Sequence, residues 1–171
     1  DDLCGGVVSS LNVTDLSLMV VNATNGVEAG TEAAGRHAEA LNSPMVFVLN
    51  QLDHDNSNFD AALDQCKSAF GNKITIVQYP IDAGPSFSSI IDVLKMKMYK
   101  FGKEGGKPEK LAIPENQQAI ANQLHNELVE KAAENDEDLM ELFFEKGTLN
   151  EDEMRAGIKA GMLNHDVFPV F

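Results

Sequence analysis

The chain of 171 residues is 43% hydrophobic and 23% charged, which is typical of a soluble globular protein with one domain, or one domain and a subdomain. Its 27 acidic and 13 basic residues give a net charge of −14. Such a surface would repel a phosphate backbone, so a basic protein partner is favoured over direct nucleic-acid binding. No apolar run approaches the ~18 residues that a membrane span needs, and Cys4 and Cys66 have no metal-like spacing, which favours a reduced, cytoplasmic setting.

Apolar runs and turn formers predict alternating strands and helices in the first half of the chain. In chain order they indicate a short helix at 7–13, a strand at 16–22, a helix at 28–41, a strand at 45–50, a helix at 57–70 and a strand at 74–79. Ser57 and Asp60 resemble a capping box, and Gly71 falls where helix C-caps are common. The unbroken apolar run from Met45 is typical of a strand buried on both faces. This order predicts a doubly wound α/β fold with a parallel sheet.

The second half of the chain predicts a small α+β unit. Apolar residues alternate with lysines between 87 and 101, and this period of two indicates a half-exposed strand. A glycine-rich loop at 102–108, helices at 115–134, 138–146 and 150–161, and a strand at 168–171 follow. In the first of these helices Ile120 and Leu124 share the apolar face, and Asn150 and Glu153 form a capping box for the last.

This pattern predicts an insertion within the sheet. We assign residues 1–80 to the first unit, 81–165 to the inserted subdomain and 166–171 to a strand that returns to the first sheet. The chain begins without methionine and closes inside an apolar run, so we expect a fragment of a longer protein.

Two polar residues follow the strand at 45–50. Asn50 and Asp53 stand at its carboxyl end, where ligands bind in open α/β sheets. An amide offers both a donor and an acceptor, and a carboxylate three residues later offers acceptors, which together suit guanine. The spacing alone is a weak signal, because Asn and Asp are also common in ordinary turns after strands.

Other candidate sites are less consistent with known chemistry. The four histidines have no ligand spacing, so a metal site is not expected. Asp53, Asp55 and Ser57 resemble the start of a calcium loop, but Asn58 stands where glycine is needed, and that interpretation is rejected. The acidic run at 134–138 fits a solvated helix start, although it is also suited to docking a basic partner.

Four segments, in order along the whole chain, resemble the elongation factor G family of translational GTPases. They are the run at 21–32, the motif Asn50-Gln51-Leu52-Asp53, the stretch Phe87-Ser-Ser-Ile-Ile-Asp-Val-Leu-Lys-Met-Lys97, and the helical segments at 130–140 and 148–153. The second falls where that family carries its guanine-recognition motif, Asn-Lys-x-Asp. The resemblance implies a P-loop-GTPase-type sheet, of which the chain holds the later half, with the subdomain inserted in translocase-type factors.

The resemblance also implies what lies outside the chain. The phosphate-binding loop and first switch would precede Asp1, and Asp1 and Asp2 would fall in the second switch. The complete protein would bind GTP or GDP with Mg²⁺, hydrolyse GTP and move tRNA and mRNA through the ribosome. This piece would supply no Mg²⁺ ligand or catalytic residue and would not hydrolyse GTP. Its acidic subdomain would be suited to the stalk protein of the large ribosomal subunit.

The family's base contacts transfer to three residues. Asn50 would hold guanine at O6 and N7, and Asp53 would accept from N1 and N2. Gln51 departs from the family lysine, whose stem lies along the purine. At ~0.8 kcal/mol per methylene, its shorter side chain would cost roughly 1–2 kcal/mol, about tenfold in affinity. A divergent ribosome-binding paralogue with a weakened or lost nucleotide site therefore remains an alternative, and a release factor or ribosomal protection protein is a third.

Overall fold

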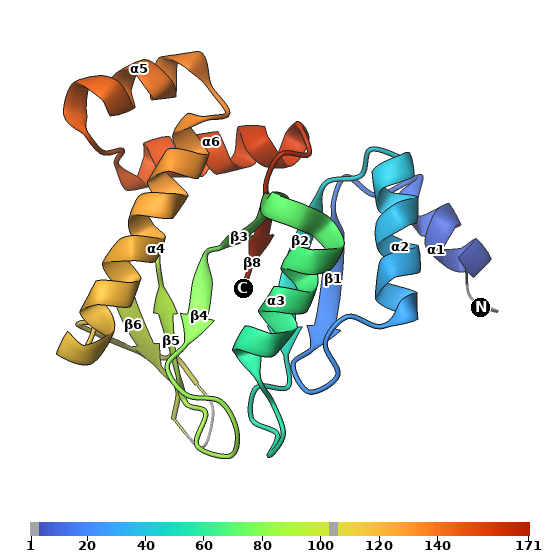
Figure 1. The fold of residues 1–171 in the computed structure, drawn as a ribbon, viewed down its shortest axis with the longest axis horizontal. Coiled ribbons are helices and arrows are strands. Elements are labelled where there is room, and N and C mark those ends of the chain that lie inside the picture. Colours follow the sequence, from blue (N-terminus) through green and yellow to red (C-terminus); the bar gives the residue numbers. More distant parts are fainter. Residues whose placement is uncertain (1–3, 103–105) are drawn as a thin grey trace.

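The computed structural model describes residues 4–102 and 106–171, and these residues form two four-stranded sheets (Figure 1). The first sheet is parallel, with the strand order β1-β2-β8-β3, and the second is antiparallel, with the order β4-β5-β6-β7. The predicted α/β fold with a small inserted α+β subdomain is confirmed.

The parallel sheet is built as the apolar runs predict. Its strands are β1 (Ser17–Asn22), β2 (Met45–Asn50), β3 (Ile74–Ile76) and β8 (Phe168–Val170). The helices of this half are α1 (Cys4–Leu11), α2 (Ala29–Ala40) and α3 (Phe59–Phe70), with a 3₁₀ turn at Gly71–Lys73. Strand β8 returns from the far end of the chain to lie between β2 and β3. The inserted residues therefore leave the parallel sheet after β3 and return to it at the neighbouring strand, β8.

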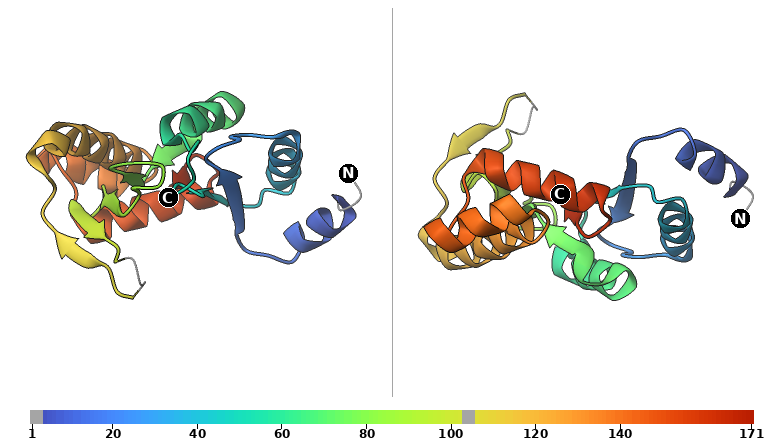
Figure 2. Two further views of the ribbon diagram at one scale, coloured as in Figure 1. Left: turned by 90° about the horizontal axis from the view of Figure 1, so that it is seen from below. Right: turned by 90° about the horizontal axis from the view of Figure 1, so that it is seen from above.

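Only one face of β1 and β2 is fully buried. Helices α2 and α3 lie on the same side of the sheet (Figure 2), and Phe47 there contacts Phe70 at a ring-centroid distance of 4.9 Å. Leu18 and Val20 point to the opposite face of β1 and are 61% and 53% exposed. The prediction that the strand at 45–50 is buried on both faces is therefore wrong, because the two helices cover one side and the side chains of β2 that face the other way are only half-buried.

The predicted strand at 74–79 is wrong, because it divides at Val77 between the two sheets. Strand β3 ends at Ile76 and β4 (Gln78–Pro80) begins the antiparallel sheet. The Val77 N–H donates to Val170 in the first sheet at 2.9 Å, and its carbonyl accepts from the N–H of Val93, which directly follows β5 of the second sheet, at 2.9 Å. One buried residue thus joins the two sheets.

The second sheet contains a hairpin where a single strand was predicted. Its further strands are β5 (Ser89–Asp92), β6 (Lys97–Lys100) and β7 (Glu109–Leu111). The prediction of one strand over 87–101 is wrong, because residues 93–96 turn the chain. The Asp92 carboxylate accepts from the Lys95 N–H at 2.9 Å and closes this turn, and Met96 has a φ of 51°. The alternation of apolar residues and lysines therefore runs through a turn instead of along one strand.

Three helices complete the second half, and their caps are partly those predicted. They are α4 (Glu115–Ala133), α5 (Glu137–Lys146) and α6 (Glu151–Leu163). The Asn150–Glu153 capping box of α6 is confirmed, as is the C-cap at Gly71. Asn58, not Ser57, caps α3 by accepting from the Ala61 N–H at 3.0 Å, so the Ser57–Asp60 box is wrong.

Ile120 is 49% exposed, so its predicted place on the apolar face of α4 is wrong. Ala121 is buried there instead.

Some predictions fall on residues that the structure does not describe. The assignment of Asp1 and Asp2 to a switch lies outside the described residues, as does the part of the predicted 102–108 loop at 103–105. Among the helices of residues 4–102 and 106–171, none is both long enough and apolar enough to cross a membrane.

Candidate functional site

The carboxyl ends of β1 and β2 meet at one edge of the parallel sheet. The two strands pair in parallel along their whole length, so that Asn22 lies opposite Asn50. The loops that follow are joined by hydrogen bonds, from the Ala23 N–H to the Asn50 carbonyl at 2.9 Å and from the Asn58 N–H to the Ala23 carbonyl at 3.0 Å. The fold therefore brings together at this edge the polar residues of two segments distant in sequence.

Asn50 and Asp53 present polar side chains to solvent at this edge. Both residues are exposed. Across residues 4–102 and 106–171, neither side chain takes part in a hydrogen bond or an ion pair, whereas the nearby side chains of Asn22, Asn25 and Asn58 do. An amide and a carboxylate that are both accessible, three residues apart, offer one donor and several acceptors to a flat heterocycle.

Gln51, between these two residues, is held in an unusual conformation. Its φ is 61°, in the left-handed region that residues with a Cβ seldom occupy. Its side-chain Oε1 accepts a hydrogen bond of 2.6 Å from Nδ2 of Asn22. The Gln51 side chain is thus directed toward the end of β1.

The far end of the same loop is anchored by a second set of bonds. The carbonyl of Leu52 accepts from Oγ of Ser57 at 2.8 Å and from the Gly84 N–H at 2.7 Å. The Gly84 N–H also lies 3.0 Å from Oγ of Ser57. Ser57, predicted to cap a helix, therefore braces the loop that carries Asn50 and Asp53.

Asn22 was not predicted as a site residue, because its type and position suggest an ordinary turn former. A signal was nevertheless present. Asn22 is the last residue of β1, and the carboxyl ends of parallel strands meet at one edge. Placing the two strand ends side by side would have brought Asn22 next to the Asn50–Asp53 motif.

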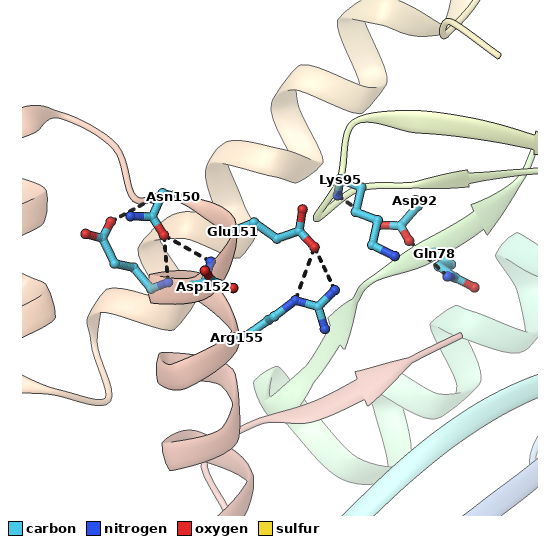
Figure 3. A network of polar contacts seen from close by, with 8 residues as sticks. Gln78, Asp92, Lys95, Asn150, Glu151, Asp152 and Arg155 are labelled. Carbon is cyan, nitrogen blue, oxygen red and sulfur yellow. Dashed lines mark hydrogen bonds and ion pairs between the residues drawn. The ribbon is translucent and has the colours of Figure 1, made fainter. Parts of the chain in front are cut away.

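A second polar cluster lies away from this edge, around the turn of the β5–β6 hairpin (Figure 3). Asp92 is 5% exposed and accepts from Gln78 Nε2 at 3.2 Å as well as from Lys95. Arg155 of α6 is paired with Glu151 at 2.7 Å, and this hydrogen bond raises the pKa of the guanidinium.

Beside this cluster lies a groove of about 390 Å³ whose lining includes Val46, Asp92, Arg155, Met162 and Phe171. Neither Asn50 nor Asp53 lines this groove. The buried Asp92 carboxylate is already paired with partners that shape the turn. The cluster therefore has a structural explanation.

Cys66 is not a nucleophile candidate. Its side chain is fully buried in α3, and burial raises the pKa of the thiol to about 11, so that it stays protonated at neutral pH. Groups of three or more His, Cys, Asp or Glu side chains that could hold a metal ion are absent from the described parts of the chain. The accessible amide and carboxylate at the sheet edge offer recognition by hydrogen bonds.

Three comparisons relate the chain to known proteins. The family model of the elongation factor Tu GTP-binding domain matches residues 2–164. The elongation factor G-like protein of Thermotoga maritima is 30% identical over 169 residues, which make up 99% of this chain and 24% of that protein. A crystal structure of a Thermus thermophilus protein has a TM-score of 0.87 and 26% identity, covering 99% of this chain and 25% of that one. The chain thus spans about a quarter of the length of these two relatives.

Proposed function

The chain belongs to the family of the elongation factor Tu GTP-binding domain, and from this premise we propose that it forms the guanine-recognition part of an elongation factor G-type translational GTPase. The observation that carries the proposal is the pair of accessible side chains, Asn50 and Asp53, at the carboxyl edge of a parallel sheet. Ligands of open α/β sheets bind at such edges.

In this proposal the two residues recognise different parts of the base. Asn50 donates from its amide nitrogen to O6 or N7 of guanine. Asp53 accepts from N1–H and the 2-amino group, and adenine offers no matching pair of donors. Both side chains are free to make these bonds, so binding would not first have to break a hydrogen bond within the described chain.

Gln51 makes the proposed site a weaker one. The family lysine covers the purine with its aliphatic stem, whereas Gln51 is shorter and bonded to Asn22. The loss of packing corresponds to roughly 1–2 kcal/mol, or about tenfold in affinity. Guanine would still be recognised, because both residues that contact the base edge are retained.

The described residues hold no candidate cluster for Mg²⁺. Bound GTP would supply the phosphoryl group that is transferred to water, and this chemistry depends on metal and phosphate-loop contacts. The proposal assigns this chain only the recognition of the base.

We extend the proposal to the complete protein as a ribosome-dependent, cytoplasmic factor that moves tRNA and mRNA. Residues 81–165 would form its inserted subdomain, between residues 1–80 and the returning strand at 166–171. Helix α5 offers a surface for the stalk protein, since Phe144 is 79% exposed and lies next in sequence to Glu145. A basic, partly apolar partner fits that chemistry.

The test is a titration of the complete natural protein with fluorescent GDP and GTP, beside a Gln51→Lys variant. We expect micromolar binding by the wild type and tighter binding by the variant, because the gain in packing on the purine, about tenfold, exceeds the loss of the Asn22–Gln51 hydrogen bond. If neither protein binds, the guanine site is refuted and the alternative, a ribosome-binding paralogue with a lost nucleotide site, takes its place. The family match does not favour that alternative.

A further inference from the structure

One side chain joins the two loops at the carboxyl edge of the parallel sheet. Asn22 ends β1, and its half-buried side chain uses both of its polar atoms. Nδ2 donates to Gln51 at 2.6 Å, and Oδ1 accepts from the Thr24 N–H at 2.8 Å. A displacement of Asn22 would therefore disturb the loop after β1 and the loop after β2 together.

Gln51, the partner of Asn22, has a strained backbone conformation. Gln51 has a φ of 61°, where its Cβ crowds the backbone carbonyl oxygen. This conformation turns the chain directly after Asn50, so the spacing of Asn50 and Asp53 depends on it. The hydrogen bond from Asn22 restrains the Gln51 side chain and favours this turn over the extended alternatives.

The rest of the motif is already held from the other side. The carbonyl of Leu52 accepts from Ser57 Oγ at 2.8 Å and from the Gly84 N–H at 2.7 Å. Both residues between Asn50 and Asp53 are therefore restrained, Leu52 through its backbone and Gln51 through its side chain. A loop held in its binding conformation loses less entropy when it binds a ligand.

We propose that Asn22 is a positioning residue for guanine recognition, which holds Gln51 and thereby presents Asn50 and Asp53 to the base. The inference rests on the proposed function and deepens it, by extending the site to a residue of the neighbouring strand. Asn22 itself does not touch the base in this account. It acts through Gln51.

The experiment measures GDP and ADP affinity for variants of the complete natural protein. Asn22→Ala removes the bond to Gln51, and we expect about fivefold weaker GDP binding with a smaller preference for GDP over ADP. Asn22→Asp keeps an acceptor for the Thr24 N–H. Its carboxylate can also accept from the Gln51 amide after that amide rotates, so this variant should keep most of the wild-type GDP affinity. Asn25→Ala is the matched control, because Asn25 is exposed in the same loop and its side chain bonds to Glu28, at 3.3 Å, instead of to Gln51.

A double-mutant cycle separates positioning from a merely structural role. In a Gln51→Ala background, Asn22→Ala should change GDP affinity by less than twofold, because its partner is already gone. The proposal is overturned if the wild type binds GDP and Asn22→Ala binds it equally well, or if the loss persists undiminished in the Gln51→Ala background. Absence of GDP binding by the wild type would refute the proposed function itself, and the inference with it.

Discussion

The carboxyl edge of the parallel sheet and the antiparallel unit use the same kinds of polar residue in different ways. At the edge, the side chains of Asn50 and Asp53 are exposed and make no hydrogen bond or ion pair within the described chain. In the antiparallel unit, Asp92 closes a turn, while Asp136 and Asn150 cap helices at 3.1 Å and 2.9 Å. The two side chains at the edge are therefore available to a ligand, whereas these three side chains of the antiparallel unit already have structural partners.

The sharpest test of this contrast is Asp53→Ala. Two charge-assisted hydrogen bonds to guanine would be lost, so we expect GDP affinity to fall by about 3 kcal/mol, or more than hundredfold. The unfolding free energy should change by no more than about 0.5 kcal/mol, because the side chain is exposed and unpaired within the described chain. Calorimetric titration and thermal melts measure the two effects. Asp55→Ala, an exposed carboxylate two residues away, is the control and should leave both unchanged.

Gly157→Ala should lower the stability of the protein and leave its GDP affinity unchanged. A Cβ at this position of α6 would lie 2.2 Å from the carbonyl oxygen of Ala132 in α4, so the two helices would have to separate. We expect a loss of about 1–3 kcal/mol in unfolding free energy. Gly30→Ala in α2 is the control, because no atom of the described chain outside its own helix lies within 4 Å of the added methyl. A melting temperature equal to that of the wild type would contradict the tight α4–α6 packing.

Asn150→Ala tests the structural use of a polar residue in the second region. Its side chain accepts from the N–H groups of Asp152 and Glu153 at 3.0 Å and 2.9 Å. Loss of this cap should destabilise the protein by about 1 kcal/mol, with GDP affinity unchanged. Chemical denaturation measures the first quantity. A change in GDP affinity at temperatures where the variant is folded would contradict a purely structural role for Asn150.

The smallest expected effect is the pH dependence of the same cap. The Glu153 carboxylate accepts from the Asn150 N–H at 2.7 Å, and this bond, followed by the charge of Lys146, lowers the pKa of Glu153 from its ordinary 4.5. A lowered pKa contributes stability that is present above pH 4.5 and is lost as the pH falls through the lowered value. Glu153→Gln should therefore be less stable than the wild type at pH 6, and the two should converge as the pH falls through the lowered pKa of Glu153. A difference that stays constant with pH would show that the charge is unimportant.

Most of the fold could be predicted from residues whose partners are local. The apolar run at 45–49, the Asn150–Glu153 box and the Gly71 cap depend on patterns within a few residues, and all lie where predicted. The division at Val77 could not be predicted in this way, because it depends on β8, which comes more than ninety residues later. The hairpin could not be predicted because the alternation at Leu94, Met96 and Met98 runs through the turn at 93–96 into β6.

The candidate site shows the same limit. Asn50, Gln51 and Asp53 are adjacent in sequence and could be proposed together, whereas Asn22 enters only through the pairing of β1 with β2. The left-handed backbone of Gln51 was also beyond prediction, since glutamine has no special preference for that region. The hydrogen bond from Ser57 to Leu52 depends on the course of the loop, which local sequence does not show. The sequence therefore suggests only a helix cap for Ser57.

A competition between GDP, IDP and ADP for the complete natural protein would show whether Asn50 and Asp53 recognise guanine. IDP lacks only the 2-amino group that Asp53 would accept from, so the account predicts that IDP binds roughly tenfold or more weakly than GDP. ADP, which offers neither donor pair nor O6, should bind more weakly still. Equal affinity for the three nucleotides would contradict recognition of guanine by Asn50 and Asp53.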